Sequence, residues 1–243
     1  MIAITMTATR RPELLERTLG SFKQHVWSPL HDWKLILNID PVGHKIPSIH
    51  VLDAAREYFD DITCLMPRQP SFPKAFIWTW TYSYMAEYVF HIEEDWEFLR
   101  PIELDEMIGI LNDTKDLALL RLPMFRSSEA HMKNWSHFYP FNGQYFECPA
   151  DKRIELGFCG HPTLLRGEFV RRTTPLLLSD RNPEKQFHRG HPLLMEEIPK
   201  WRYGVFGKPN QGPAIRDIGR EWMVEHGWAK EGNKAHFTQW TKV

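Results

Sequence analysis

The sequence predicts an α/β protein in which one mostly parallel central sheet is flanked by helices in a single domain. Short apolar runs that suit strands alternate with segments of helical periodicity through the first half of the chain, which is the order of βαβ units. Such apolar runs suit strands that are buried on both faces. A length of 243 residues fits one large domain.

The composition is that of an ordinary globular protein. Hydrophobic residues make up 42% of the chain, which is enough for a packed core, and charged residues make up 25%. The formal net charge is −1, so the chain as a whole has no attraction to nucleic acid or anionic lipid. A local basic patch remains compatible with this balance.

The cysteines and the apolar segments indicate a cytoplasmic protein. Cys64, Cys148 and Cys159 are widely separated and have neither CxxC nor zinc spacing, which argues against a disulfide framework. Met1 leads directly into an apolar strand without the regions of a signal peptide. No apolar stretch approaches the roughly 18 residues of a membrane span. We therefore expect no membrane insertion, and the oligomeric state is left open.

The first strand and helix form a candidate anion site. Residues 2–9 predict a strand, and residues 12–26 predict a helix that starts with a proline at its first position. Thr7 and Thr9 lie at the strand exit beside the helix N-terminus, and Arg11 can add a phosphate contact. A capping threonine with solvated arginines explains these residues equally well.

The second strand, residues 33–40, ends in Asp40. A carboxylate at this position can accept hydrogen bonds from a ribose or a base, although an aspartate that caps a turn is an equally good interpretation. A helix over 51–59, a strand over 62–66 and an aromatic-rich helix over 74–88 are expected next. That helix is followed by the fourth strand.

The fourth strand leads into the most informative stretch of the sequence. The apolar run 89–92 is followed directly by Glu93, Glu94 and Asp95. Carboxylates at the end of a buried strand are costly unless a cation neutralises them, and ligands bind at that edge of an open α/β sheet. Clustered carboxylates suit Mg²⁺ or Mn²⁺. The alternative is a solvated acidic loop, and the position after a buried strand favours the metal.

The second half of the chain is less regular. A helix over 104–112 and a strand over 117–122 precede residues 125–148, where basic and aromatic residues mix without periodicity. A loop that binds an acceptor sugar or an unstacked base and an antiparallel hairpin with an aromatic face are equally favoured there. Further expected elements are a loop entering a strand over 157–166, a helix beginning over 167–172, a last strand over 203–206 and a short helix over 221–228.

The order and spacing of these motifs resemble the nucleotide-sugar-dependent glycosyltransferases of the GT-A fold, of the family-2-like kind. Residues 4–22 are similar to the first strand and helix of that family. The segment His91-Ile-Glu-Glu-Asp-Trp-Glu-Phe98 looks like its acidic metal motif, usually written Asp-x-Asp, and residues 160–166 resemble the strand that closes over the acceptor side. Glu196 and Glu197 resemble the late acidic motif that supplies the catalytic base in inverting members.

The resemblance implies a Rossmann-like GT-A domain over residues 1–220. Residues 1–100 would form the half that binds the nucleotide sugar, and residues 101–220 the half that binds the acceptor. Residues 221–243 would be a C-terminal helix and tail packed on that domain.

The resemblance also implies a metal-dependent hexosyl- or pentosyltransferase. It would move a sugar from a nucleoside diphosphate sugar, with UDP favoured, to an acceptor hydroxyl with inversion. The acceptor would be a glycan or a small molecule, and basic residues clustered over 121–133 and 166–189 leave a hydroxylated base of DNA as a further option. The ligands expected for Mn²⁺ or Mg²⁺ are Asp95, Glu93 and Asp217. The residues expected to bind the donor are Thr7, Thr9, Arg11, Asp40, Lys74, Glu94 and Arg216. Glu197 is the favoured base, and Glu196 is the alternative.

Two departures from the family pattern matter. The metal motif reads Glu93-Glu94-Asp95 instead of Asp-x-Asp, and residues 213–220 lack the late histidine that many members bring to the metal or the pyrophosphate. Asp217 could replace that histidine, or Arg216 could neutralise the diphosphate, while His226 and His236 are weaker candidates.

Two other functions remain as alternatives. A nucleotidyltransferase that forms sugar nucleotides is disfavoured because residues 5–12 contain no glycine. A catalytically degenerate GT-A-like module that binds a glycan or nucleic acid is the stronger alternative, and the two departures above favour it.

Overall fold

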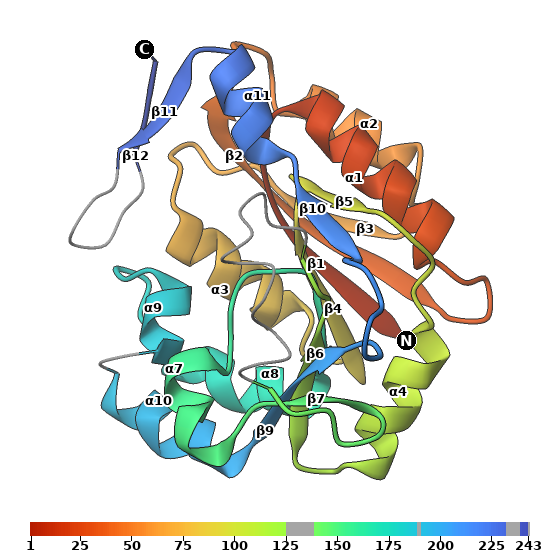
Figure 1. Cartoon of the computed structure of the whole chain (residues 1–243). Helices are drawn as coiled ribbons and strands as arrows, with labels where there is room; N and C mark the ends of the chain where they lie inside the picture. The colour runs from red at the N-terminus through yellow and green to blue at the C-terminus, as the bar shows by residue number, and fades with distance from the viewer. Residues whose placement is uncertain (125–138, 189–190, 232–238, 243) are drawn as a thin grey trace.

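The computed structural model describes residues 1–124, 139–188, 191–231 and 239–242. Its centre is an eight-stranded sheet with the order β3-β2-β1-β4-β8-β6-β9-β7 (Figure 1). Strands β8 and β7 run antiparallel to their neighbours, and the other pairings in the sheet are parallel. The predicted α/β class with a mostly parallel sheet is confirmed.

The first half of the chain alternates strands and helices as expected. Its elements are β1 (Ile2–Arg10), α1 (Pro12–His25), β2 (Trp33–Gly43), α2 (Ile49–Arg56), β3 (Ile62–Leu65), α3 (Phe72–Tyr82), β4 (Tyr88–Glu93) and β5 (Trp96–Phe98). The prediction of a helix over 74–88 was wrong at its C-terminal end. The Ser83 hydroxyl donates to the carbonyl of Trp80 (2.8 Å), and Tyr88 already pairs with Ile2 in the sheet. The helix therefore stops at Tyr82.

The second half has more elements than its sequence pattern predicts. They are α4 (Leu104–Asp113), β6 (Leu117–Arg121), β7 (Tyr145–Glu147), α7 (Arg153–Leu156), β8 (Thr163–Arg166), α8 (Gly167–Thr173), α9 (Pro183–His188), α10 (Pro192–Glu197), β9 (Arg202–Phe206), β10 (Ile215–Asp217), α11 (Gly219–Glu225), β11 (Trp228–Glu231) and β12 (Gln239–Lys242). Short 3-10 turns cover Ala150–Lys152, Thr174–Leu176 and Ile198–Lys200.

Two expectations for this half need correction. Residues 203–206 are not the last strand, because β10 follows and pairs with β5, and β11 pairs with β12. The helix expected over 221–228 begins at Gly219 and ends at Glu225. Of the irregular segment 125–148, residues 125–138 lie outside the described residues, and residues 145–147 form the edge strand β7.

Helices cover the sheet on both faces. One core cluster joins Ile2, Ile4 and Met6 of β1 to apolar side chains of α1, α2 and α4. The opposite cluster joins Ala3 of β1 to apolar side chains of α3, α8, α9 and α10. Burial on both faces explains the nearly continuous apolar runs of the central strands. Within the described ranges, no helix has the length and hydrophobicity required to cross a membrane.

A small appendage lies on the edge of the sheet where β1, β2 and β4 end. The β5–β10 pair leads into α11, and the Ile218 amide donates to the carbonyl of Asp95 (2.9 Å). Ile218, Trp222 and Met223 pack with Leu14 of α1 in a small apolar cluster. The segment from β10 to α11 is therefore fixed against the carboxyl ends of the central strands (Figure 1).

Candidate functional site

The carboxyl ends of β1, β2 and β4 bring together the residues that the sequence singles out. The parallel pairing of β1 with β4 places Thr7 opposite Glu93, and β2 ends on the other side of β1. We call this group the strand-exit site. Its members are Thr7, Thr9, Arg11, Asp40, Glu93, Glu94 and Asp95.

Arg11 forms the centre of the strand-exit site. Its guanidinium binds Glu94 through Nε (3.0 Å) and Nη2, and it reaches Oδ2 of Asp95 (3.2 Å). The amide and hydroxyl of Thr9 also donate to Glu94 (3.1 and 2.8 Å). Burial by itself lowers the pKa of Arg11, but the charges of Glu94 and Asp95 outweigh it and raise the pKa. The cation that the acidic motif requires is thus supplied in part by the protein itself.

Asp95 is held from two sides. Arg11 binds its carboxylate, and the backbone of the β10–α11 segment covers it. A Cβ atom at Gly219 would lie only 2.8 Å from the carboxyl carbon of Asp95, so a side chain does not fit there without displacement. Glycine at this position allows the backbone of α11 to approach the acidic motif closely.

Asp40 is buried in β2, which continues to Gly43 and does not end at Asp40 as predicted. The protein binds both oxygens of its carboxylate. Asn38 donates to Oδ1 and the amide of Ser71 donates to Oδ2, both at 2.9 Å. Burial raises the pKa of Asp40, and these hydrogen bonds offset part of the increase. Its contact with the nucleoside stays a prediction, and the observed bonds tie β2 to the start of α3. Lys74, in the first turns of α3, is exposed.

The residues expected from β10 are engaged in ion pairs. Arg216 binds Glu97 through Nε (3.0 Å), and Arg17 binds the same carboxylate at 2.9 Å. Asp217 accepts from the amide of Gly219 (3.0 Å) and pairs with Arg220 (3.2 Å). Both side chains therefore stabilise the β10–α11 segment.

The two candidate bases of α10 differ in their environments. Glu196 is exposed, whereas Glu197 is buried and binds Arg172 (2.7 Å), Lys200 (2.8 Å) and the indole of Trp201 (3.0 Å). Burial raises the pKa of Glu197, but these partners outweigh it and lower the pKa. In Figure 1, α10 lies at the bottom of the view and α11 at the top. The catalytic role of either residue stays a prediction.

Glu184 is a site residue that was not predicted, and its carboxylate converges with that of Glu93 on one glycine. A Cβ atom at Gly160 would lie 2.8 Å from Oε1 of Glu184 and 3.4 Å from Oε1 of Glu93, and the Gly160 amide donates to Glu184. Glu184 lies in the first turn of α9, directly after Pro183. A proline at a helix start followed by an acid is a signal that the sequence contains.

A thiol and two basic side chains lie near the same edge of the sheet. Arg121 ends β6 and donates to Sγ of Cys159 (3.1 Å), and the ring of His161 lies 5.1 Å from that of Trp96. Burial alone raises the pKa of Cys159, but the charges and hydrogen bonds of His161 and Arg121 outweigh it and lower the pKa to about 6. A pKa below that of a free thiol favours the thiolate form of Cys159.

The expected metal ligands do not form a preassembled set. Within the described ranges, one group of three His, Cys, Asp or Glu side chains has all its ligand atoms within 4.8 Å of one another, namely Glu13, His44 and His226. Glu93, Asp95 and Asp217 do not meet that criterion. Glu94 and Asp95 nevertheless share a single guanidinium, which leaves negative charge that a divalent cation could balance.

No protein-family model and no curated protein matches this sequence. Solved structures do resemble it. The crystal structure of S. aureus TarS 1-349 in complex with UDP-GlcNAc has 10% identity and a TM-score of 0.60, covering 88% of this chain and 57% of that chain. Mannosyltransferase PcManGT from Pyrobaculum calidifontis, in complex with GDP-Man and Mn²⁺, has 11% identity and a TM-score of 0.58, covering 89% of this chain and 56% of that chain.

These similarities concern the fold. The chain adopts the architecture of GT-A-type glycosyltransferases, as its strand order and flanking helices indicate. It spans somewhat more than half the length of these two chains. Function must be argued from the site, since one fold supports many activities.

Proposed function

We propose that the protein is a glycosyltransferase that moves a sugar from a nucleoside diphosphate sugar to an acceptor hydroxyl. The observation that carries this proposal is the acidic motif at the exit of β4 in a GT-A-like sheet, opposite Thr7 and beside Arg11. Ligands of open α/β sheets bind at this edge. The similar structures contain UDP-GlcNAc or GDP-Man with Mn²⁺, which supports a nucleoside diphosphate sugar as the donor here. A UDP-sugar is the donor that we propose.

Asp95 and Glu93 are the ligands that we propose for Mn²⁺ or Mg²⁺, with Asp217 as a further candidate. When bound, such an ion neutralises the charge of the departing diphosphate. Arg11 fixes the carboxylate of Asp95, so the ligand has a defined orientation before the ion arrives. Thr9 and Asp40 border the same edge, and we propose that the nucleoside lies there.

Glu184 competes with Glu196 and Glu197 for the role of general base. Its carboxylate approaches Gly160 together with that of Glu93, whereas Glu197 is bound by Arg172, Lys200 and Trp201. A base at this position would accept the proton of the acceptor hydroxyl. The acceptor oxygen then forms a bond to the anomeric carbon, and the bond from that carbon to the diphosphate breaks with its electron pair leaving on the nucleoside diphosphate.

A thermal-shift panel tests the proposal. The Tm of the protein is measured in the presence of UDP, GDP, CDP or dTDP, each with and without Mn²⁺. A ligand at a hundredfold excess over its Kd stabilises the native state by about 2.7 kcal/mol. We expect one nucleotide to raise the Tm only with Mn²⁺, and D95N to lose the effect. D105N is the matched control, because Asp105 lies on α4 and pairs with His31 on the surface.

A catalytically degenerate binding module is the second candidate. The ion pairs of Arg11 with Glu94 and Asp95 favour a binding module, since they already neutralise part of the charge of the acidic motif. A metal-dependent nucleotide shift without hydrolysis or transfer of the matching nucleotide sugar would support this module over an enzyme. If the protein is folded and no nucleotide raises its Tm, the transferase proposal is contradicted.

The acceptor is proposed as a glycan or a small molecule, with a hydroxylated base of DNA as a further option. Binding of DNA would weaken steeply with salt, because neutralised phosphates release counterions. A titration of double-stranded DNA at two salt concentrations separates this option from an uncharged acceptor.

A further inference from the structure

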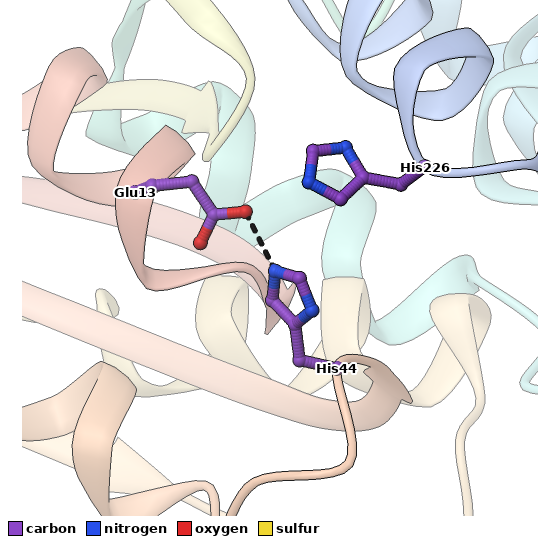
Figure 2. Close-up of side chains that lie close together, drawn as sticks. All are labelled: Glu13, His44 and His226. Carbon is purple, nitrogen blue, oxygen red and sulfur yellow. Dashed lines mark hydrogen bonds and ion pairs between the residues drawn. The ribbon is translucent and has the colours of Figure 1, made fainter.

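Three side chains from distant parts of the sequence converge outside the strand-exit site. Glu13 lies in the first turn of α1, His44 follows β2 and His226 follows α11. Their ligand atoms all lie within 4.8 Å of one another, and the Glu13 Oε1 to His44 Nε2 distance is 2.8 Å. Figure 2 shows the two rings and the carboxylate pointing toward one another.

The donor set selects a class of ion. Two imidazole nitrogens and one carboxylate suit Zn²⁺ and neighbouring transition metals better than Mg²⁺ or Ca²⁺, which prefer oxygen ligands. Metal bonds of about 2.0–2.2 Å place the ligands of a tetrahedral ion roughly 3.3–3.6 Å apart. The observed spacing, between 2.8 and 4.8 Å, requires movements on the order of 1 Å by side chains that are exposed or half-buried.

A hydrogen bond on the far side of its ring orients His226 for a metal. The Nδ1 atom of His226 lies 2.9 Å from the carbonyl oxygen of Trp222. A carbonyl oxygen can only accept, so Nδ1 carries the proton, and in the neutral form of the ring the lone pair lies on Nε2. Metal-binding histidines commonly have such a partner on the other ring nitrogen.

Trp222 holds all three side chains in place. Its ring stacks on His226 at 4.3 Å with an interplanar angle of 14°, and it meets the ring of His44 edge-on at 5.2 Å. Its indole N–H also donates to Glu13. One rigid aromatic residue therefore positions each of the three candidate ligands.

We propose that Glu13, His44 and His226 form a binding site for a divalent transition-metal ion such as Zn²⁺. The ion would join α1, the exit of β2 and the end of α11. The Arg11 guanidinium lies 5.2 Å from the centre of the Trp222 ring, so Trp222 lies between this cluster and the strand-exit site. The proposal does not depend on the function proposed above.

The test uses the full chain after removal of metal with a chelator. Zn²⁺ is titrated by calorimetry, and Co²⁺ is added as a spectroscopic probe of coordination. Mg²⁺ is the negative control. We expect one equivalent of Zn²⁺ to bind and to raise the Tm by roughly 5–10 °C at a hundredfold excess over the Kd. H44Q and H226Q should each weaken binding by about tenfold or more.

The chain offers a matched control in His31, which pairs with Asp105 at 2.7 Å. This is also a surface histidine bound to a carboxylate, and H31Q should leave the affinity for Zn²⁺ unchanged. E13Q repeats the test from α1 if H226Q disturbs the end of α11, and circular dichroism confirms that each variant is folded. Equal affinity in the wild type, H44Q and E13Q would overturn the proposal, since the ion would then bind elsewhere.

A second comparison separates this site from the donor site. D95N should keep its affinity for Zn²⁺, and H44Q should keep any shift that a nucleotide produces with Mn²⁺. Loss of Zn²⁺ binding in D95N would overturn the proposal of a separate site. A protein that binds Zn²⁺ through these residues but no nucleotide would support this site and contradict the transferase proposal alone.

Discussion

At the scale of single residues, the strand-exit site is defined by how its charges are paired. Glu94 and Asp95 share Arg11, Glu97 is shared by Arg17 and Arg216, and Glu197 is bound in a network of its own. Sequence position alone does not separate these acids. Their partners do, because a carboxylate with several cationic neighbours is a poor proton acceptor at neutral pH.

The first prediction concerns the base. E184Q should lower kcat for sugar transfer by about 10²–10⁴-fold, because the amide cannot accept the acceptor proton. E197Q should change kcat little and instead lower stability, since it weakens the pairs with Arg172 and Lys200. Steady-state kinetics with the nucleotide sugar identified by thermal shift measures the first effect, and thermal unfolding measures the second. The reverse pattern would restore Glu197 as the base.

The second prediction concerns Cys159. Its thiolate fraction should rise with pH around a midpoint of about 6, because His161 and Arg121 stabilise the anion. Cys64 is the control within the chain, since burial raises the pKa of its thiol to about 11. Alkylation with iodoacetamide, followed by peptide mass spectrometry at several pH values, should label Cys159 well before Cys64 at pH 7. H161N should move the midpoint upward, and equal labelling of both thiols would contradict this prediction.

At the scale of elements, the β10–α11 segment closes one side of the site. It contacts Asp95 through the amide of Ile218 and through the bare backbone of Gly219, while Trp222 reaches Arg11 and Glu13. The segment is short, so tertiary contacts and not helix propensity hold it in place. A change in its packing should therefore reach the acidic motif directly.

The third prediction follows from this packing. G219A should destabilise the protein by about 1–3 kcal/mol, because the new methyl group meets the Asp95 carboxylate and α11 must shift. G109A is the matched control, since a Cβ atom at Gly109 of α4 meets nothing within 4 Å and alanine favours a helix by about 1 kcal/mol. Urea unfolding of both variants measures the difference. Equal stability of the two variants would mean that α11 does not lie on Asp95.

At the scale of the whole molecule, the sheet joins the two halves that the sequence predicts. Strand β4 belongs to the first half, and it pairs with β1 on one side and with β8 of the second half on the other. Each half therefore contributes neighbours to the same core clusters. The two halves therefore cannot separate without breaking the hydrogen bonds between β4 and β8.

The fourth prediction is that the chain unfolds as one unit. Circular dichroism and tryptophan fluorescence should give coincident thermal transitions, because both core clusters include residues from each half. A change that disturbs the contact between β4 and α8, such as G167A at the start of α8, should lower the midpoint temperatures of both transitions together. Its Cβ atom would lie 2.9 Å from the carbonyl oxygen of Glu87. Two separate transitions would instead indicate two domains.

The sequence by itself determined the layered α/β architecture and the edge of the sheet that carries the acidic motif. Local periodicity is sufficient for this, since strands such as residues 89–92 are apolar on both faces and ligands gather at strand exits. It also predicted the five elements from β1 to β3 closely. It failed where boundaries depend on caps and pairing, as at the end of α3 and in β10 to β12.

Only the tertiary structure decided which charges meet. Arg11 lies 83 residues from Glu94 in the sequence, and Glu184 reaches Gly160 across 24 residues. The group of Glu13, His44 and His226 joins three separate segments. Hydrophobic periodicity determines how each segment folds but contains no information about such distant contacts, which depend on strand order and on how α9 and α11 pack onto the sheet.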